Sequence, residues 1–340
     1  MIMTAPSGRP RPWCIILAGG GGSRLHGCTV DSTGHHVPKQ YCVVDAGRTL
    51  LQLAIARAEL FVDLDHVVVV VSSQHRRWWK PQLAGVLPRE NVVVQPLSRG
   101  TAVGVLLPLL RVLARDPAAH VVLLPADHHF RHEDRLARVI RVCLDHTDHE
   151  PSTLVFVGVE ANSATSDFGY IVPRTSGGTG PSPVASFHEK PRPELAQHLV
   201  GRGALWNTLI FAARGRYLLQ VIRERFPHTV AALRVAVSPE IDLDRQALAL
   251  AAIYPGLTNI DLSADVLQHV TGSMAVTPAI DVGWSELGTP DRVCAFWDEI
   301  RPARIGRKPS GSPASRPAAA SALFSASAAG GGGISLRPPE

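Results

Sequence analysis

The sequence predicts an α/β protein with a mostly parallel β-sheet flanked by helices. Short apolar runs typical of buried strands alternate with segments of helical apolar spacing through the first half of the chain. A chain of 340 residues with 45% hydrophobic content can bury a substantial core in one large domain or two. No apolar stretch approaches the roughly 18 to 20 residues of a membrane helix, so we expect no membrane partner.

Each expected element follows from its own apolar pattern. Continuous apolar runs predict strands at residues 14–17, 67–71, 92–94, 121–124 and 154–157. Apolar spacing of i, i+3 and i+4 predicts crossover helices at 50–60, 103–113 and 136–144. After residue 168 the chain is richer in turns, with strands expected at 184–187 and 209–212 and helices at 215–225 and 244–252. We expect this second half to cap the first.

The net positive charge lies in the C-terminal tail. The whole chain has a formal net charge of +5, and residues 301–340 contain six basic residues against one acidic residue. The remaining 300 residues are therefore about neutral, which argues against nucleic-acid binding by the folded part. The tail is rich in Pro, Ala, Ser and Gly, so we expect disorder over 301–340 and in the N-terminal segment 1–12.

The N-terminus and the cysteines indicate a cytoplasmic protein. The first twelve residues include three prolines and lack the apolar core of a signal peptide. The five cysteines are odd in number and widely spaced, which favours neither a disulfide framework nor a C-x-x-C zinc site.

A glycine-rich loop after the first predicted strand is the most informative segment. Four consecutive glycines at 19–22 have little packing value, so their bare amides or positive φ angles must be needed. Successive N–H groups in such a turn bind anions, and Ser23 and Arg24 add further phosphate donors. Lys39 offers a mobile positive charge. The loop fits a polyphosphate but matches neither the P-loop nor the dinucleotide fingerprint, and a flexible hinge is the alternative.

Two aspartates follow apolar runs and suit a magnesium ion. Asp127 ends the fourth predicted strand, at the sheet edge where the glycine loop is expected. Asp281 follows another apolar run and precedes a glycine. Magnesium uses one or two carboxylates together with phosphate and water, so this pair predicts a metal site. For each aspartate alone, a cap or turn role is the alternative.

Polar residues at later strand ends suit a phosphorylated sugar. Glu189 fits sugar hydroxyls and Lys190 a phosphate monoester, with a solvated surface pair as the alternative. Asn207 precedes an apolar run and is a candidate hydroxyl contact or an ordinary turn residue. Among the histidines near the predicted site, His128 is the one most expected to have a function.

These motifs resemble those of the sugar-1-phosphate nucleotidyltransferases. Eight occur in family order: L-A-G-G-G-G-S-R-L at 17–25, P-K-Q at 38–40, R-G-T-A at 99–102, P-A-D-H at 125–128, G-Y-I at 169–171, E-K-P at 189–191, W-N-T at 206–208 and D-V-G-W-S-E-L-G at 281–288. The P-A-D-H and G-W-S-E-L-G versions are most similar to the mannose-1-phosphate guanylyltransferase branch.

The resemblance implies a Rossmann-like (GT-A-like) domain over 13–300, with a nucleotide-binding part at 13–160 and a smaller sugar-binding part at 161–300. It implies the reaction of GTP with α-D-mannose 1-phosphate to GDP-mannose and pyrophosphate, with Mg²⁺ and in-line attack. It places the nucleotide on Leu17, Ala18, Gly19, Gly20, Gly22, Ser23, Arg24, Gln95, Arg99, Thr101 and Asp127. It also implies catalytic roles for Arg24 and Lys39, sugar-phosphate contacts from Gly169, Glu189, Lys190 and Asn207, and Mg²⁺ ligation by Asp127 and Asp281.

Departures from the family pattern leave the substrate pair open. Gly100 replaces the family's Asn, Leu209 stands where many relatives have Gly, and the loop after Leu25 keeps little of the family sequence. Glucose 1-phosphate with dTTP, UTP or ATP is therefore an alternative pair. A silent GDP-mannose-binding regulator is a further alternative, against which the retained Arg24 and Lys39 argue. A homodimer is the assembly we would expect.

Overall fold

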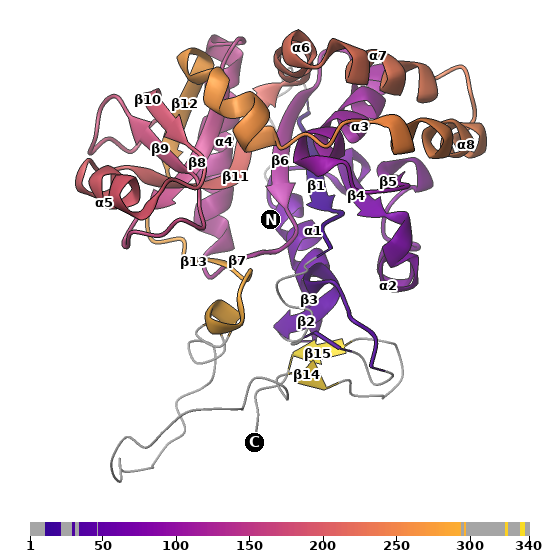
Figure 1. The fold of residues 1–340 in the computed structure, drawn as a ribbon, viewed down its shortest axis with the longest axis horizontal. Coiled ribbons are helices and arrows are strands. Elements are labelled where there is room, and N and C mark those ends of the chain that lie inside the picture. Colours follow the sequence, from indigo (N-terminus) through magenta and orange to yellow (C-terminus); the bar gives the residue numbers. More distant parts are fainter. Residues whose placement is uncertain are drawn as a thin grey trace.

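A computed structural model of the chain describes residues 11–21, 29–30, 34–45, 47–293 and 296, with two short strands farther on (Figure 1). Nine strands form one mixed sheet in the order β5-β4-β1-β6-β11-β8-β12-β10-β9. These strands are β1 (Trp13–Ala18), β4 (Val67–Ser72), β5 (Val92–Gln95), β6 (His120–Pro125), β8 (Leu154–Glu160), β9 (Tyr170–Pro173), β10 (Ser182–His188), β11 (Leu205–Arg214) and β12 (Met274–Pro278).

Strand direction divides the sheet into two parts. β5, β4, β1 and β6 are all parallel, as the alternating pattern of the first half predicts. β11 runs antiparallel to both β6 and β8, and β10 runs antiparallel to β12 and β9. The expected α/β class is confirmed, and its antiparallel strands lie in the second half of the chain.

Helices cover both faces of the sheet. They are α1 (Leu50–Glu59), α2 (Arg76–Leu83), α3 (Gly100–Arg115), α4 (Glu133–His149), α5 (Pro193–Gly201), α6 (Gly215–Arg225), α7 (Pro227–Ala236) and α8 (Leu243–Ile253). Alternate residues of β1 enter different cores: Cys14 and Ile16 pack with α1 and α4, whereas Trp13 and Ile15 pack with α3 and α6. This two-sided burial explains why the strands read as unbroken apolar runs.

Short elements gather at the carboxyl ends of β1 and β6. A 3-10 turn, η2 (Lys39–Tyr41), leads into β2 (Cys42–Asp45) and β3 (Arg48–Thr49). β7 (His128–Phe130) pairs antiparallel with β13 (Trp284–Glu286), although about 155 residues separate them in sequence. Figure 1 shows this two-stranded ribbon below β8 and β11 of the main sheet. No described helix is long and apolar enough to cross a membrane.

All of the predicted strands and helices occur, with ends that differ by a few residues. The sequence did not predict the helices α2, α5 and α7, the strands β2, β3, β9 and β12, or the β7–β13 ribbon. In the tail, the structure describes β14 (Phe324–Ser325) and β15 (Ile334–Leu336), which pair with each other, and β15 also pairs with β2; disorder of the tail stays a prediction. The rest of 301–340 and residues 1–10 lie outside the described residues.

Candidate active site

The end of β1 is held by η2, the turn that contains the P-K-Q motif. The side-chain amide of Gln40 donates to the carbonyl oxygens of Ala18 (2.9 Å) and Gly20 (2.8 Å), and the Tyr41 hydroxyl donates to Ala18 (2.9 Å). The glycine loop and the P-K-Q motif, which are about 20 residues apart in sequence, therefore lie side by side. Of the predicted loop residues, Gly22, Ser23 and Arg24 lie outside the described part of the chain, so their roles stay predictions.

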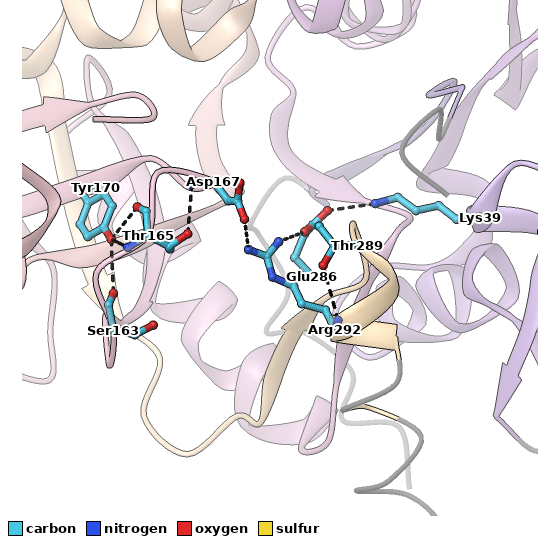
Figure 2. A network of polar contacts seen from close by, with 8 residues as sticks. All are labelled: Lys39, Ser163, Thr165, Asp167, Tyr170, Glu286, Thr289 and Arg292. Carbon is cyan, nitrogen blue, oxygen red and sulfur yellow. Dashed lines mark hydrogen bonds and ion pairs between the residues drawn. The ribbon is translucent and has the colours of Figure 1, made fainter. Parts of the chain in front are cut away.

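Lys39 lies between two carboxylates. Its ammonium nitrogen is 2.9 Å from Oδ2 of Asp127 and 3.0 Å from Oε1 of Glu286. All three side chains are largely withdrawn from solvent, with 10% of the Lys39 side chain, 32% of Asp127 and 11% of Glu286 exposed. Figure 2 shows Lys39 reaching Glu286 from the opposite side of the site. The cluster is a buried arrangement of one cation and two anions.

The three groups stabilise one another's charged forms. Burial alone would raise the pKa of Asp127, but the charges of Lys39 and His128 outweigh it and lower that pKa to about 2. Burial likewise opposes ionisation of Glu286, and Lys39 again prevails and lowers its pKa. For Lys39, burial favours the neutral amine, but the two carboxylates raise its pKa. At neutral pH the site therefore holds a charged lysine and two ionised carboxylates.

The β7–β13 ribbon sets the positions of Asp127 and Glu286. Glu286 pairs with His128, the residue directly after Asp127, so the ribbon register brings both carboxylates to the same end. Burial lowers the pKa of His128, and its Nδ1 lies 3.2 Å from Nε1 of Trp284. His128 thus packs within the ribbon beside the site.

A buried arginine fixes the ribbon to the first half of the chain. Arg57, on α1, is 1% exposed and binds the Glu133 carboxylate through Nε (2.6 Å) and Nη2 (2.8 Å). The same Nη2 donates to the backbone oxygen of His128 at 3.2 Å. A bidentate, charge-assisted contact of this kind constrains direction as well as distance. Arg57 and Glu133 therefore position the segment that carries Asp127, and neither was singled out from the sequence.

Asp281 does not join Asp127, contrary to the expectation for a paired metal site. It lies five residues before Glu286, at the far end of the ribbon. Its backbone has a φ of 51°, its side chain is 78% exposed, and its Oδ2 lies 3.6 Å from Nη1 of Arg135. The left-handed turn at Asp281 and Gly283 directs the chain into β13, and Glu286 is the residue that arrives beside Lys39. Glu286 is the glutamate of the W-S-E-L-G motif, so that motif could have identified it from the sequence.

The predicted sugar-contact residues do come together. A Cβ added at Gly169 would lie 2.6 Å from Oε2 of Glu189 and 3.3 Å from Cβ of Asn207. The backbone N–H of Asn207 donates to the Gly169 oxygen at 2.8 Å. Burial raises the pKa of Glu189, opposed by Lys190, whose Nζ lies 3.7 Å from Glu189 Oε1. The missing side chain at Gly169 leaves Glu189 room beside Asn207.

Arg292 connects this region to the Lys39 cluster. Its guanidinium donates to Glu286 at 2.8 Å and also binds Asp167, two residues before Gly169 (Figure 2). It lies 4.3 Å from the centre of the Phe168 ring, within range of a cation–π contact. An unbroken chain of charged contacts thus runs from Lys39 to the loop that carries Gly169. No sequence motif had singled out Arg292.

Among the residues predicted to contact the nucleotide, Gln95 lies beside the glycine loop. A Cβ added at Gly19 would lie 3.1 Å from Gln95 Nε2. Arg99 instead donates to the backbone oxygens of Tyr254 and Pro255, at 2.7 Å each. Thr101 accepts from the N–H of Leu262 at 2.7 Å. These last two side chains anchor the start of α3 to the segment 254–262.

Gly100, which differs from the family's Asn, has a steric explanation. Its φ is +81°, and a Cβ there would lie 2.1 Å from the backbone oxygen of Ile260. Only glycine fits this close approach. Leu209, the other departure, has a φ of 56° in the irregular part of β11. This is a left-handed backbone conformation, which the glycine of many relatives would adopt more easily than a leucine.

The donor set fits a hard divalent cation. No cluster of three or more potential metal ligands occurs among the described residues, but magnesium needs only one or two carboxylates. Asp127 and Glu286 already share one cation, the Lys39 ammonium, which shows that both carboxylates can address the same positive charge.

Comparison with known proteins gives consistent matches over most of the chain. A family model described as nucleotidyl transferase matches residues 13–300. The alginate biosynthesis protein AlgA of Pseudomonas aeruginosa is 30% identical over 293 residues, covering 84% of this chain and 57% of that protein. Mannose-1-phosphate guanylyltransferase of Escherichia coli is 29% identical over 296 residues, covering 81% and 57%. The chain spans somewhat more than half the length of these relatives.

Solved structures share the fold. A crystal structure described as mannose-1-phosphate geranyltransferase from Thermus thermophilus superposes with a TM-score of 0.70 at 22% identity, covering 82% of this chain and 77% of that one. UDP-glucose pyrophosphorylase, solved with UDP-glucose, gives a TM-score of 0.54 at 11% identity, covering 85% and 97%.

Proposed function

The chain belongs to the nucleotidyl transferase family, and from this premise we propose that it transfers GMP from GTP to α-D-mannose 1-phosphate, forming GDP-mannose and pyrophosphate. The observation that carries the proposal is the Lys39 ammonium, buried between Asp127 and Glu286 at the end of the glycine loop. The name of the Escherichia coli relative, mannose-1-phosphate guanylyltransferase at 29% identity, supports the choice of mannose and guanosine.

In the proposed reaction a phosphate oxygen of the sugar phosphate attacks the α-phosphorus of GTP. A new P–O bond forms as the bond to the β-phosphate oxygen breaks, and pyrophosphate leaves with that electron pair. Both reactants are anions, so the protein acts mainly by positioning them and by neutralising charge. Lys39 supplies a positive charge beside the glycine loop, and Arg24 is proposed to act on the same phosphates. No acid or base residue is needed.

Two carboxylates would hold Mg²⁺. We propose Asp127 and Glu286 as its ligands, in place of the Asp127–Asp281 pair expected from the sequence. The bound ion would supply further neutralisation of the triphosphate. Lys39 pairs with both carboxylates in the structure. A divalent ion bound to them would take its place, and the Lys39 ammonium could then contact a phosphate.

The sugar phosphate is proposed to bind at the second group of residues. Glu189 and Asn207 offer an acceptor and an amide to sugar hydroxyls beside Gly169. Lys190 is 60% exposed, so its ammonium can reach a phosphate without displacing core groups. The cytoplasm, where nucleotides and sugar phosphates are available, is the proposed location.

A substrate panel tests the choice of base and sugar. Initial rates would be measured for GTP, dTTP, UTP and ATP, each with mannose 1-phosphate and with glucose 1-phosphate. We expect GTP with mannose 1-phosphate to give the highest kcat/KM by at least about tenfold. A higher kcat/KM for another pair would replace this assignment while leaving the transfer chemistry intact.

A further inference from the structure

A groove lies at the end of the sheet opposite the candidate active site. It has a volume of about 730 Å³ and is formed by the last turns of α3 together with α6 and α7, which lie along the top of the molecule in Figure 1. Pro117, on its wall, precedes β6 by three residues, whereas Asp127 follows β6 by two. At about 3.3 Å per residue, this strand separates the groove from Asp127 by roughly 20 Å or more. The groove is therefore not part of the active site.

Three arginines and no acidic residue are found among the described residues that line this groove. Arg216 and Arg223 come from α6, and Arg234 comes from α7. Arg216 donates through Nε to the Pro117 oxygen at 2.6 Å, which holds it at the rim. Within the part of the chain that the structure describes, Arg223 and Arg234 make no ion pair and no side-chain hydrogen bond. Uncompensated guanidinium groups facing one groove favour an anion, and their paired donors match phosphate oxygens.

The spacing of the arginines favours more than one phosphate. Arg216 and Arg223 are seven residues apart on one helix, which places them on the same face about 10 Å apart along its axis. A diphosphate or triphosphate offers separate phosphate groups to guanidiniums whose side chains start this far apart. Gln220 and Ser238 are neutral polar residues on the same wall: the Gln220 amide donates to Glu224 at 2.8 Å, and the Ser238 hydroxyl accepts from the N–H of Glu240 at 3.4 Å.

The rest of the groove is apolar. Leu110, Leu219 and Val237 are buried in the core below, so the apolar surface open to a ligand comes from Ala114, Pro117 and Pro239. Leu113 completes this floor. A flat, uncharged ring can cover such a surface without leaving polar groups unsatisfied, and the volume lies within the range of small-molecule sites. An inorganic polyphosphate alone would leave the floor exposed.

We propose that this groove binds a nucleotide with two or more phosphates, with its base on the apolar surface of Leu113, Ala114, Pro117 and Pro239 and its phosphates on Arg223 and Arg234, with Arg216 at the rim. The site is separate from catalysis, and the proposal does not depend on the proposed function. The occupant would contact the last turn of α3, whose first turn carries Thr101 beside the candidate active site.

Hydrogen-exchange mass spectrometry of the full chain tests the proposal, because it reports where a ligand binds. ADP and inorganic pyrophosphate would be titrated separately, without sugar phosphate. We expect ADP to slow exchange in residues 110–117 and 216–239, and pyrophosphate to do so at least about threefold more weakly because it cannot use the apolar floor. Protection around residues 19–21 would report the active site separately.

Matched variants assign the contacts. Arg223→Ala/Arg234→Ala should weaken ADP protection at the groove at least about tenfold and leave protection near 19–21 unchanged. Arg223→Lys/Arg234→Lys keeps both charges but loses the paired donors, so it should give an intermediate loss. Arg138→Ala/Arg245→Ala removes two other exposed arginines, on α4 and α8, and should change protection less than about twofold.

Three results would overturn the proposal. The first is no protection at the groove by millimolar ADP in the unmodified chain. The second is groove protection that the Arg223→Ala/Arg234→Ala change leaves intact. The third is pyrophosphate binding as tightly as ADP, which would remove the base from the site. Circular dichroism of each variant confirms that a loss of protection comes from a folded protein.

Discussion

The Lys39 ammonium lies 2.9 Å from the Asp127 carboxylate, although 88 residues separate them in sequence. The carboxyl ends of two adjacent parallel strands, β1 and β6, explain this proximity, since both residues follow those ends. Glu286 reaches the same ammonium from a third segment. The site is therefore assembled from the first half of the domain and from the ribbon that closes it.

The charge of this cluster predicts a specific acid sensitivity. The pKa of Asp127 is lowered to about 2 in the folded chain, so the stability it contributes is present above its ordinary pKa near 3.8. That stability is lost as pH falls from about 4 toward 2, and a shift of this size corresponds to on the order of 2 kcal/mol. Urea unfolding at pH 6, 4 and 3 should show a smaller acid-induced loss in Asp127→Asn. Identical pH dependence in both proteins would contradict the pairing.

Substitutions at Glu286 and at Asp281 should differ in their effect on the Mg²⁺ dependence of the rate. Asp127→Asn and Glu286→Gln should each lower kcat at least about a hundredfold and raise the Mg²⁺ concentration needed for half-maximal rate, since each removes a proposed ligand. Asp281→Asn is the matched control, because its exposed carboxylate lies at the other end of the ribbon. Loss of Mg²⁺ dependence in Asp281→Asn alone would restore the pairing expected from the sequence.

Lys190 should affect binding of the sugar phosphate more than the chemical step. Its side chain is 60% exposed, so Lys190→Ala costs little stability. We expect KM for the sugar phosphate to rise about tenfold or more while kcat changes less than about threefold, because the contact is the same in the ground and transition states. Lys80→Ala, at an exposed position on α2, should alter neither. A fall in kcat without a change in KM would assign Lys190 a different role.

Leu209 stores backbone strain in β11. Its φ of 56° is unfavourable for a leucine by about 1 to 2 kcal/mol, a cost that glycine would not incur. Leu209→Gly also loses partly buried apolar contacts, so we expect a net change in unfolding free energy of less than about 1 kcal/mol. Thermal unfolding measures the sum. A loss above about 3 kcal/mol would show that the leucine contacts outweigh the strain.

The sequence predicted the first-half strands well because burial on both faces leaves continuous apolar runs. It did not predict β7 and β13, which are three residues long and acquire strand structure only by pairing with each other across the chain. α2 was missed because its sequence, R-R-W-W-K-P-Q-L, has few apolar positions and an internal proline.

In the candidate site, too, local patterns predicted some features, whereas contacts between distant segments decided others. Gly169, Glu189 and Asn207 were grouped from motifs, and the structure brings them together. The choice between Asp281 and Glu286 depended on the register of the ribbon and on the left-handed turn before it. Arg292 and Arg57 act through side-chain contacts between distant segments, which local patterns do not encode.

Release of pyrophosphate is the decisive measurement for the proposed nucleotidyl transfer. The full chain would be incubated with GTP, mannose 1-phosphate and Mg²⁺, and with each component omitted in turn, while released pyrophosphate is measured and the nucleotide product is identified by mass. We expect pyrophosphate to be released only when all three are present, in equal amount with GDP-mannose, and to be lost in Asp127→Asn. No release by folded protein with any nucleotide and sugar phosphate of the panel would contradict it.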